Sequence, residues 1–191
     1  LSSSSNDNTV TGNTCNNNNR GIYLSSSSNN NTVTGNTCNN NDGYGIYLSS
    51  SNNDNTVTGN TCNNNNNYGI CLYSSSNNTV TGNTCNNSKY GINLDSSSNN
   101  TVTGNNCNNN NYGIRLSSSS NNTITGNTCI RGTGQTSDYA SNQYTIQLQG
   151  TDNNYNLISS NNCMGKAVIV GGTGNSVWGN KYGSGNDLPY V

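Results

Sequence analysis

The sequence contains no histidine, glutamate or phenylalanine, and only one proline, one methionine and one tryptophan. Only 7% of its residues are charged, and the formal net charge is -1. A chain without His or Glu has few groups for acid–base catalysis. Such low charge also excludes the basic surface that binds nucleic acid and the polybasic patch that binds membranes. No stretch approaches the roughly 20 apolar residues of a membrane span. We therefore predict no nucleic-acid partner and no membrane insertion.

Hydrophobic residues are also scarce, at 27% of the chain, and Asn and Ser dominate. Taken without its order, this composition is typical of a disordered chain, because little apolar surface can offset the cost of ordering the backbone. The order of the residues reverses that prediction, since a motif close to Asn-Thr-Val-Thr-Gly-Asn-Thr-Cys recurs along the chain. The cysteines that end it follow one another at intervals of 22 to 24 residues: Cys15, Cys38, Cys62, Cys85, Cys107 and Cys129. A period of this length indicates a solenoid.

One repeat contains three short segments that alternate between inward and outward positions. Val10 points inward between two outward threonines, Cys15 points inward on the next segment, and Ile22 and Leu24 point inward on the third. An inward asparagine follows the glycine at one corner and predicts a buried amide ladder: Asn13, Asn36, Asn60, Asn83, Asn105, Asn127, Asn161 and Asn180.

The predicted fold is all-β, a single right-handed parallel β-helix (β-solenoid). It has about eight coils of 22–24 residues with three short strands each. It covers residues 1–182, with an insert loop at 130–145, and residues 183–191 form a tail or cap.

The segment from Tyr112 to Cys129, which contains SSSSNNTITGNTC, resembles the right-handed parallel β-helix repeats of the NosD type. This resemblance implies an extracellular or cell-surface location, as in bacterial periplasmic and archaeal surface proteins. NosD relatives are linked to copper delivery, and stacked thiolates could in principle hold Cu(I). A closed core without His or a cluster of Met argues against copper, so we predict no metal and no other cofactor.

Seven of the eight cysteines, the six above and Cys163, share one inward column. We expect free buried thiols that act as small hydrophobes. Disulfides between neighbouring coils are the alternative, although parallel Cβ vectors suit that bond poorly. Cys71 differs, because it replaces Tyr23 and Tyr47 in an outward column. It is expected to be exposed, either as a neutral substitution or as a thiol that cross-links molecules.

The acidic residues do not form an evident active site. Asp7 and Asp54 share a column but lie two coils apart, and glycoside hydrolysis needs two carboxylates beside one bond. Asp95 lies diagonal to Arg115 on the neighbouring coil, which we interpret as a surface ion pair of little energetic value. The sequence therefore predicts that the protein is not an enzyme.

Two outward positions of the first segment are threonine in six coils. These residues form a candidate ice- or ligand-binding face: Thr9, Thr11, Thr32, Thr34, Thr56, Thr58, Thr79, Thr81, Thr101, Thr103, Thr123 and Thr125. The pattern resembles the ice-binding faces of insect-type antifreeze β-solenoids. Threonine is also a good strand former, which explains the pattern without any ligand.

A second outward column is aromatic. Tyr44, Tyr68, Tyr90 and Tyr112 each precede a Gly-Ile pair, as does Arg20 in the first coil. Stacked tyrosines would stabilise the edge of a solenoid. The alternative is an aromatic platform that binds glycans or a protein partner.

The remaining candidates are contacts for self-assembly. Leu1 matches the last core residue of a coil, so the first coil is expected to need a covering segment or partner. The insert loop contains Arg131, Asp138 and Tyr139, and long loops on rigid scaffolds often carry function. Together with Cys71, these residues are the predicted assembly contacts.

The predicted function is that of a non-enzymatic extracellular structural or adhesive β-solenoid, which self-associates into a homo-oligomer, filaments or a surface layer. Ice binding through the threonines and carbohydrate binding through the tyrosines are the alternatives.

Overall fold

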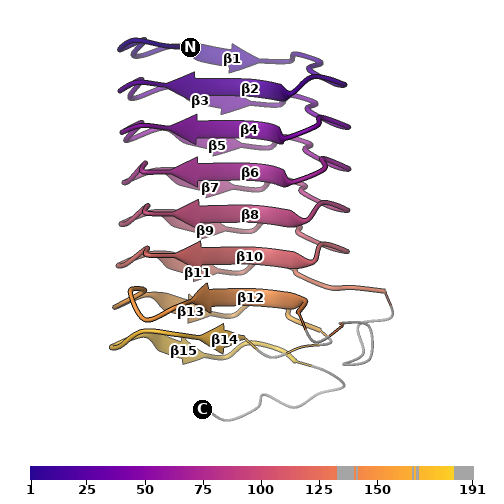
Figure 1. Cartoon of the computed structure of the whole chain (residues 1–191), viewed down its shortest axis with the longest axis vertical. Helices are drawn as coiled ribbons and strands as arrows, with labels where there is room; N and C mark the ends of the chain where they lie inside the picture. Colours follow the sequence, from indigo (N-terminus) through magenta and orange to yellow (C-terminus); the bar gives the residue numbers. More distant parts are fainter. Residues whose placement is uncertain (133–139, 141, 165, 167, 183–191) are drawn as a thin grey trace.

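Valines between outward threonines, and Ile/Leu pairs between outward polar residues, build two parallel sheets in the computed structural model. The structure describes residues 1–132, 140, 142–164, 166 and 168–182. Within these ranges the chain forms strands and turns without a helix, and therefore no helix long and apolar enough to cross a membrane. Figure 1 shows the strands stacked one coil above the next, with β1 at one end of the stack and β14 and β15 at the other.

The first sheet, which we call the threonine sheet, holds one strand of each of eight coils in parallel register. Its strands are β1 (Thr9–Thr11), β3 (Thr32–Thr34), β5 (Thr56–Thr58), β7 (Thr79–Thr81), β9 (Thr101–Thr103), β11 (Thr123–Thr125), β13 (Leu157–Ser159) and β15 (Ser176–Trp178).

The second sheet, the tyrosine sheet, has seven parallel strands. These are β2 (Arg20–Ser25), β4 (Tyr44–Ser49), β6 (Tyr68–Tyr73), β8 (Tyr90–Asp95), β10 (Tyr112–Ser117), β12 (Tyr144–Gln149) and β14 (Ile169–Val170).

The third side of each coil is shorter than the sequence predicts. Instead of a strand it contributes one residue, which forms an isolated parallel bridge with the same position of the next coil: Thr14, Thr37, Thr61, Thr84, Asn106, Thr128, Asn162 and Lys181. The prediction of a parallel β-helix is confirmed. Seven coils consist of two strands and one bridge residue, and in the eighth coil the described residues form β15 and the bridge residue Lys181.

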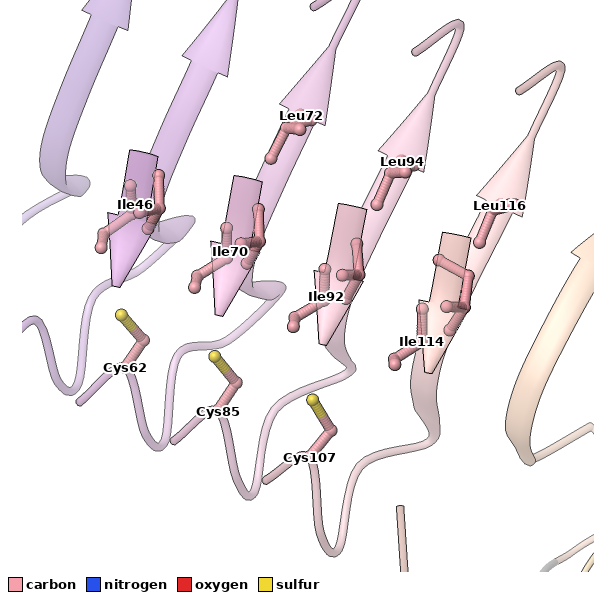
Figure 2. Close-up of a cluster of buried hydrophobic side chains, with 14 of the residues drawn as sticks. Ile46, Cys62, Ile70, Leu72, Cys85, Ile92, Leu94, Cys107, Ile114 and Leu116 are labelled. Carbon is pink, nitrogen blue, oxygen red and sulfur yellow. The ribbon is translucent and has the colours of Figure 1, made fainter. Parts of the chain in front are cut away.

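The core is a set of single-residue stacks along the solenoid. The valines of the threonine sheet and the Ile/Leu pairs of the tyrosine sheet are buried, as Val57, Ile70 and Leu72 illustrate. Figure 2 shows Cys62, Cys85 and Cys107 on successive coils, each facing the isoleucines of the opposite strands. Because each residue stacks on its own kind in the next coil, few apolar side chains suffice to close the interior.

The corners are held by buried amides. In the predicted ladder, Asn83 Oδ1 accepts from both the backbone N and the Nδ2 of Asn60, at 2.9 and 3.0 Å. Its own Nδ2 donates to the carbonyls of Val57 and Thr81. The side chain therefore satisfies backbone groups that the corner would otherwise leave buried and unpaired.

Three more ladders of this kind were not predicted. The first precedes the threonine-sheet strands, where the backbone N of Asn55 donates to the side chain of Asn78. The second follows the cysteines, where the backbone N of Asn41 donates to Asn65. The third lies in the serine-rich turn, where the backbone N of Ser75 donates to Ser97. All corners of a coil are thus fastened to the next coil by side-chain hydrogen bonds.

A column of glycines, one in the tyrosine-sheet strand of most coils, allows neighbouring coils to approach closely. A Cβ at Gly91 would lie 2.5 Å from the carbonyl oxygen of Gly113 and 3.0 Å from the Cβ of Cys107. The glycines that start the tyrosine-sheet strands are therefore required by close approach to the next coil and to the cysteine column. Thr145 takes this position in β12, where its Oγ1 donates to the carbonyl of Lys166.

Candidate functional faces

Seven tyrosine rings form one continuous stack over the outer side of the tyrosine sheet. Consecutive ring centroids lie 4.3 to 5.5 Å apart, with interplanar angles of 9° to 28°, in the order Tyr23, Tyr47, Tyr44, Tyr68, Tyr90, Tyr112 and Tyr144. Each inner ring has a neighbour on both faces. The arrangement therefore matches the predicted stabilising edge, and it leaves the flat ring faces of Tyr44, Tyr68 and Tyr90 unavailable for stacking on a sugar.

Cations cover both ends of this stack. The guanidinium carbon of Arg20 lies 4.5 Å from the ring centroid of Tyr23, and Lys166 Nζ lies 4.4 Å from that of Tyr144. Burial raises the pKa of both Tyr47 and Tyr68 to about 12. These phenols therefore remain neutral over the physiological range and act as packing groups.

The prediction that Cys71 is exposed is wrong. Its side chain is only 4% exposed, and Asn93 Nδ2 donates to its Sγ at 3.6 Å. Burial raises the pKa of this thiol to about 12. Although the position faces outward from the sheet, the tyrosine stack covers that side, so Cys71 is not available as an intermolecular cross-link.

The expected ion pair between Asp95 and Arg115 does not form. Arg115 donates instead to Asn93 Oδ1 at 2.8 Å and to Gln149 Oε1 at 2.6 Å. The register explains this result, because Arg115 lies directly opposite Asn93 whereas Asp95 lies opposite Ser117.

The threonine sheet presents the second face. Its outward threonines lie in register from β1 to β11, and from β3 onward they are half-buried beside fully buried valines or isoleucine. Thr103 and Thr125 approach to 3.4 Å between their Oγ1 atoms. The two files continue into β13 and β15, where Leu157, Ser176 and Trp178 replace threonine. We did not predict a site at these positions, although the loss of threonine from the two outward files is visible in the sequence.

All eight cysteines are free, so the alternative of disulfides along the column is wrong. From Cys38 to Cys163 the thiols of the column are buried, and Cys15 is half-buried. Burial raises the pKa of Cys163 to about 12 and that of Cys85 well above its ordinary value. At Cys62 and Cys107 burial also raises the pKa, but hydrogen bonds from the neighbouring thiols outweigh it and lower the pKa to about 5. Because solvent does not reach the column, its buried thiols are poor nucleophiles whatever their protonation.

The remaining candidate contacts that the structure describes, Leu1 and Arg131, lie in different coils. Leu1 is 40% exposed, and its amino group donates to the carbonyl of Tyr23. Arg131 is held by the carbonyl of Asn110 and by Asn111 Oδ1. Asp138 and Tyr139 lie outside the described residues, as does the tail 183–191.

Two parallel sheets, single-residue stacks and amide ladders define a parallel β-helix repeat protein. The chain belongs to the NosD family, described as "Periplasmic copper-binding protein (NosD)", which matches it over residues 1–160 and 86–190. The resemblance noted in the sequence is thus confirmed. No curated protein matches the chain.

Solved structures with a similar fold are alginate-modifying enzymes. The A-module of the Azotobacter vinelandii mannuronan C-5 epimerase AlgE6 has a TM-score of 0.76 at 14% identity, over 95% of this chain and 55% of that one. The A-module of AlgE4 from the same organism has a TM-score of 0.71 at 14% identity, over 94% and 54%. A variant of the periplasmic alginate epimerase AlgG has a TM-score of 0.69 at 22% identity, over 93% and 45%. The chain thus spans about half the length of these structures, and at such identity the likeness shows the fold alone.

The family description raises the question of copper, which the donor set of this chain does not fit. The soft donors are one thiol per coil in a closed column, and the chain has no His and a single Met. Among the residues described, no three His, Cys, Asp or Glu side chains are grouped so that they could hold a metal ion. We therefore derive no chemistry that runs through copper.

Proposed function

We propose that this chain is a non-enzymatic, rigid β-helical element that functions outside the cytoplasm, at the cell surface or beyond it, as a structural or adhesive component. One observation carries the proposal: the repeated side chains are engaged in contacts between coils. The amides fasten corners, the tyrosines stack on one another, and the thiols fill the core. A scaffold uses its repeats in this way, whereas an enzyme gathers unlike groups at one place.

The lack of acid–base groups supports the non-enzymatic part of the proposal. Epimerisation, which the solved structures with this fold perform, inverts a carbon centre by removing and replacing a proton, and that step needs positioned acid–base groups. This chain has neither His nor Glu. Asp7 and Asp54 lie in the same corner column two coils apart, with Asn30 between them.

The proposed location outside the cytoplasm rests on the family, and the buried thiols are compatible with it. The NosD family and AlgG are both described as periplasmic. An oxidising compartment normally converts free thiols to disulfides. The thiols from Cys38 to Cys163 are buried, which protects them from oxidation there.

Lateral contact through the threonine sheet is the mode of association that we propose. Six coils present uncharged hydroxyl and methyl groups in two straight files. Flat sheet faces pack against one another about 10 Å apart when their side chains interdigitate. A second copy of this chain offers the same flat face, and a two-fold contact would pair the files.

Electron microscopy and sedimentation of the purified protein test this proposal. We expect ordered dimers, ribbons or sheets, which Thr81→Lys disperses by placing a charge in the middle of the face. Asn66→Lys is the matched control, since it adds the same charge at an exposed loop position outside the threonine sheet. Monomers at all concentrations, or equal dispersal by both variants, would refute association through this face.

Ice binding is the second candidate, favoured specifically by the in-register threonine files. Inhibition of ice recrystallisation by the wild-type protein, lost in Thr79→Tyr and kept in Thr61→Tyr, would support it. Thr61 belongs to the bridge column on the third side of the coil. No inhibition by the wild-type protein would exclude it.

A further inference from the structure

In the last two coils two aromatic rings are exposed, Trp178 in β15 of the threonine sheet and Tyr155 at the corner before β13. Tyr155 is 66% exposed and Trp178 is 50% exposed, which makes them the two most exposed large hydrophobic side chains among the described residues. Trp178 lies in the outward file that holds Thr125 two coils earlier, since Ser159 pairs with both of them. Leu157 is half-buried in the neighbouring file.

Tyr155 also has an unusual backbone conformation. Its φ is +58°, at a corner where earlier coils have Asp or Asn at positive φ: Asp7, Asn30, Asp54, Asn77, Asn99 and Asn121. Asn and Asp tolerate this left-handed conformation, whereas a bulky aromatic residue in it is an outlier. Strain at an exposed side chain is a reason to look for a function at that position.

The next coil is shaped to receive the tyrosine ring. A Cβ at Gly174 would lie 2.5 Å from Cδ1 and 2.6 Å from Cε1 of Tyr155. Glycine therefore lets the ring rest against the backbone of residue 174, while two thirds of the side chain remains open to solvent. The ring is held in one orientation before any ligand arrives, which lowers the entropy cost of binding.

We propose that Tyr155 and Trp178 form a binding site for an extended, uncharged polysaccharide chain. Gly174 occupies the corner position of Tyr155 in the next coil, and Trp178 follows it by four residues, so the Cα atoms of Tyr155 and Trp178 are at most about 15 Å apart. This distance suits two non-adjacent rings of one chain, whose C–H faces would stack on the aromatic rings. The hydroxyl of Ser176, which is exposed in the same strand as Trp178, is available for a hydrogen bond to a sugar hydroxyl.

Size and charge favour this ligand over a protein partner. Two partly exposed rings of this kind offer about 200–300 Å² of surface, whereas a stable protein interface buries about 800 Å² on each partner. The outward positions of β11, β13 and β15 are occupied by Thr, Leu, Ser and Trp, none of which is charged. An uncharged, narrow ligand with many hydroxyl groups fits such a surface, and the proposal is independent of lateral assembly.

Because Trp178 is the single tryptophan of the chain, its fluorescence reports directly on this site. Titration with neutral β-1,4-linked hexasaccharides of glucose, xylose and N-acetylglucosamine is expected to give a saturable blue shift with at least one of them. A polyuronate of the same length tests whether charge matters. No shift with any neutral sugar, or a shift with the polyuronate alone, would overturn the proposal.

Tyr155→Asn is the decisive variant, since it restores the residue usual at this corner and relieves the strain, so loss of folding is not expected. We expect about tenfold or greater weakening of sugar binding, as measured by calorimetry. Trp178→Thr, which restores the threonine of its file, should have a similar effect. Tyr73→Ser removes another exposed tyrosine, at a corner where Ser49 and Ser117 occur in other coils, and should leave binding unchanged. Unchanged affinity in Tyr155→Asn would refute the site.

Discussion

The first six coils and the last two share the same arrangement of strands and corners, but they differ in how regularly each position repeats its residue. From β1 to β11 each position repeats nearly the same residue, and the side chains are engaged by their counterparts in the next coil. In the last two coils Ser160 replaces the corner glycine, and Tyr155 replaces asparagine. The comparison indicates that the inward columns and amide ladders persist, whereas substitutions accumulate at corners and outward positions.

The physical reason is that the inward columns are coupled along the whole axis, whereas only some outward positions, such as the stacked tyrosines, contact the next coil. Asn161 and Asn180 continue the predicted ladder through the last two coils, with 2.8 Å between Asn161 Nδ2 and Asn180 Oδ1. An inward change would leave groups of two neighbouring coils unpaired. A change at an outward position without such a contact alters mainly the contacts with solvent. New surface chemistry can therefore arise at the end of the solenoid without loss of the fold.

The largest effect is expected from interrupting an amide ladder in the regular coils. Asn83→Leu leaves the backbone N of Asn60 without its acceptor and removes one donor each from the carbonyls of Val57 and Thr81, of which Thr81 keeps the backbone N of Gly59. At about 1–3 kcal/mol for a buried unpaired group, we expect a loss of about 3 kcal/mol in the free energy of unfolding. Urea denaturation followed by circular dichroism measures it.

Asn180→Leu is the matched change in the last coil, where the side chain serves Asn161 and the carbonyl of Ile158. Its cost should be clearly smaller. Equal losses for the two variants would contradict the view that the ladder is more strongly coupled in the regular coils.

The second expected effect concerns the glycine column. Gly91→Ala forces a Cβ against the carbonyl of Gly113, and we expect a loss of about 3 kcal/mol. Gly82→Ala is the control: its φ is +62°, but nothing lies within 4 Å of the added Cβ, so only the left-handed conformation is penalised, by about 1–2 kcal/mol. If Gly82→Ala proves the more damaging variant in thermal unfolding, close approach is not what requires glycine at position 91.

A smaller effect of opposite sign is expected at Ser160, which has a φ of +58° where earlier coils have glycine. Ser160→Gly should stabilise the protein by about 0.5–1 kcal/mol, because glycine adopts this conformation without the penalty of a Cβ. The reciprocal change Gly126→Ser should cost about as much. Differential scanning calorimetry of both variants compares the two regions directly, and destabilisation by Ser160→Gly would show that the serine has a role of its own.

The smallest effect is a pH dependence of the tyrosine stack. Burial raises the pKa of Tyr68 to about 12 from its ordinary value near 10. The neutral phenol is therefore favoured by the folded chain, and this contribution is present below about pH 10 and is lost as the pH rises towards 12. The difference between the 295 nm absorbance titrations of the wild type and Tyr68→Phe should isolate a step near pH 12. A step near pH 10 would mean that the ring is solvated.

The inward columns were predictable because they depend only on sequence period. Val57, Ile70 and Asn83 each belong to a residue type that recurs at a fixed position of the repeat. In a solenoid, residues at the same position of the repeat point in the same direction. The predicted ladder, the core stacks and the buried thiols of the column followed from this rule. The three further ladders did not, since in turns as rich in Asn and Ser as Asn63–Asn67 composition does not reveal which side chain points inward.

The sequence by itself determined the parallel β-helix, its repeat boundaries and the residues of its core, because period and hydrophobic phase are properties of the order of residues. Only the tertiary structure decided what covers an outward position. Cys71 is outward by alternation and yet buried, because the tyrosine stack covers that side of the sheet. Tyr155 is exposed although aromatic, since the next coil offers it only Gly174. Burial of this kind depends on how side chains of different coils lie against one another in space, and no periodicity in the chain encodes it.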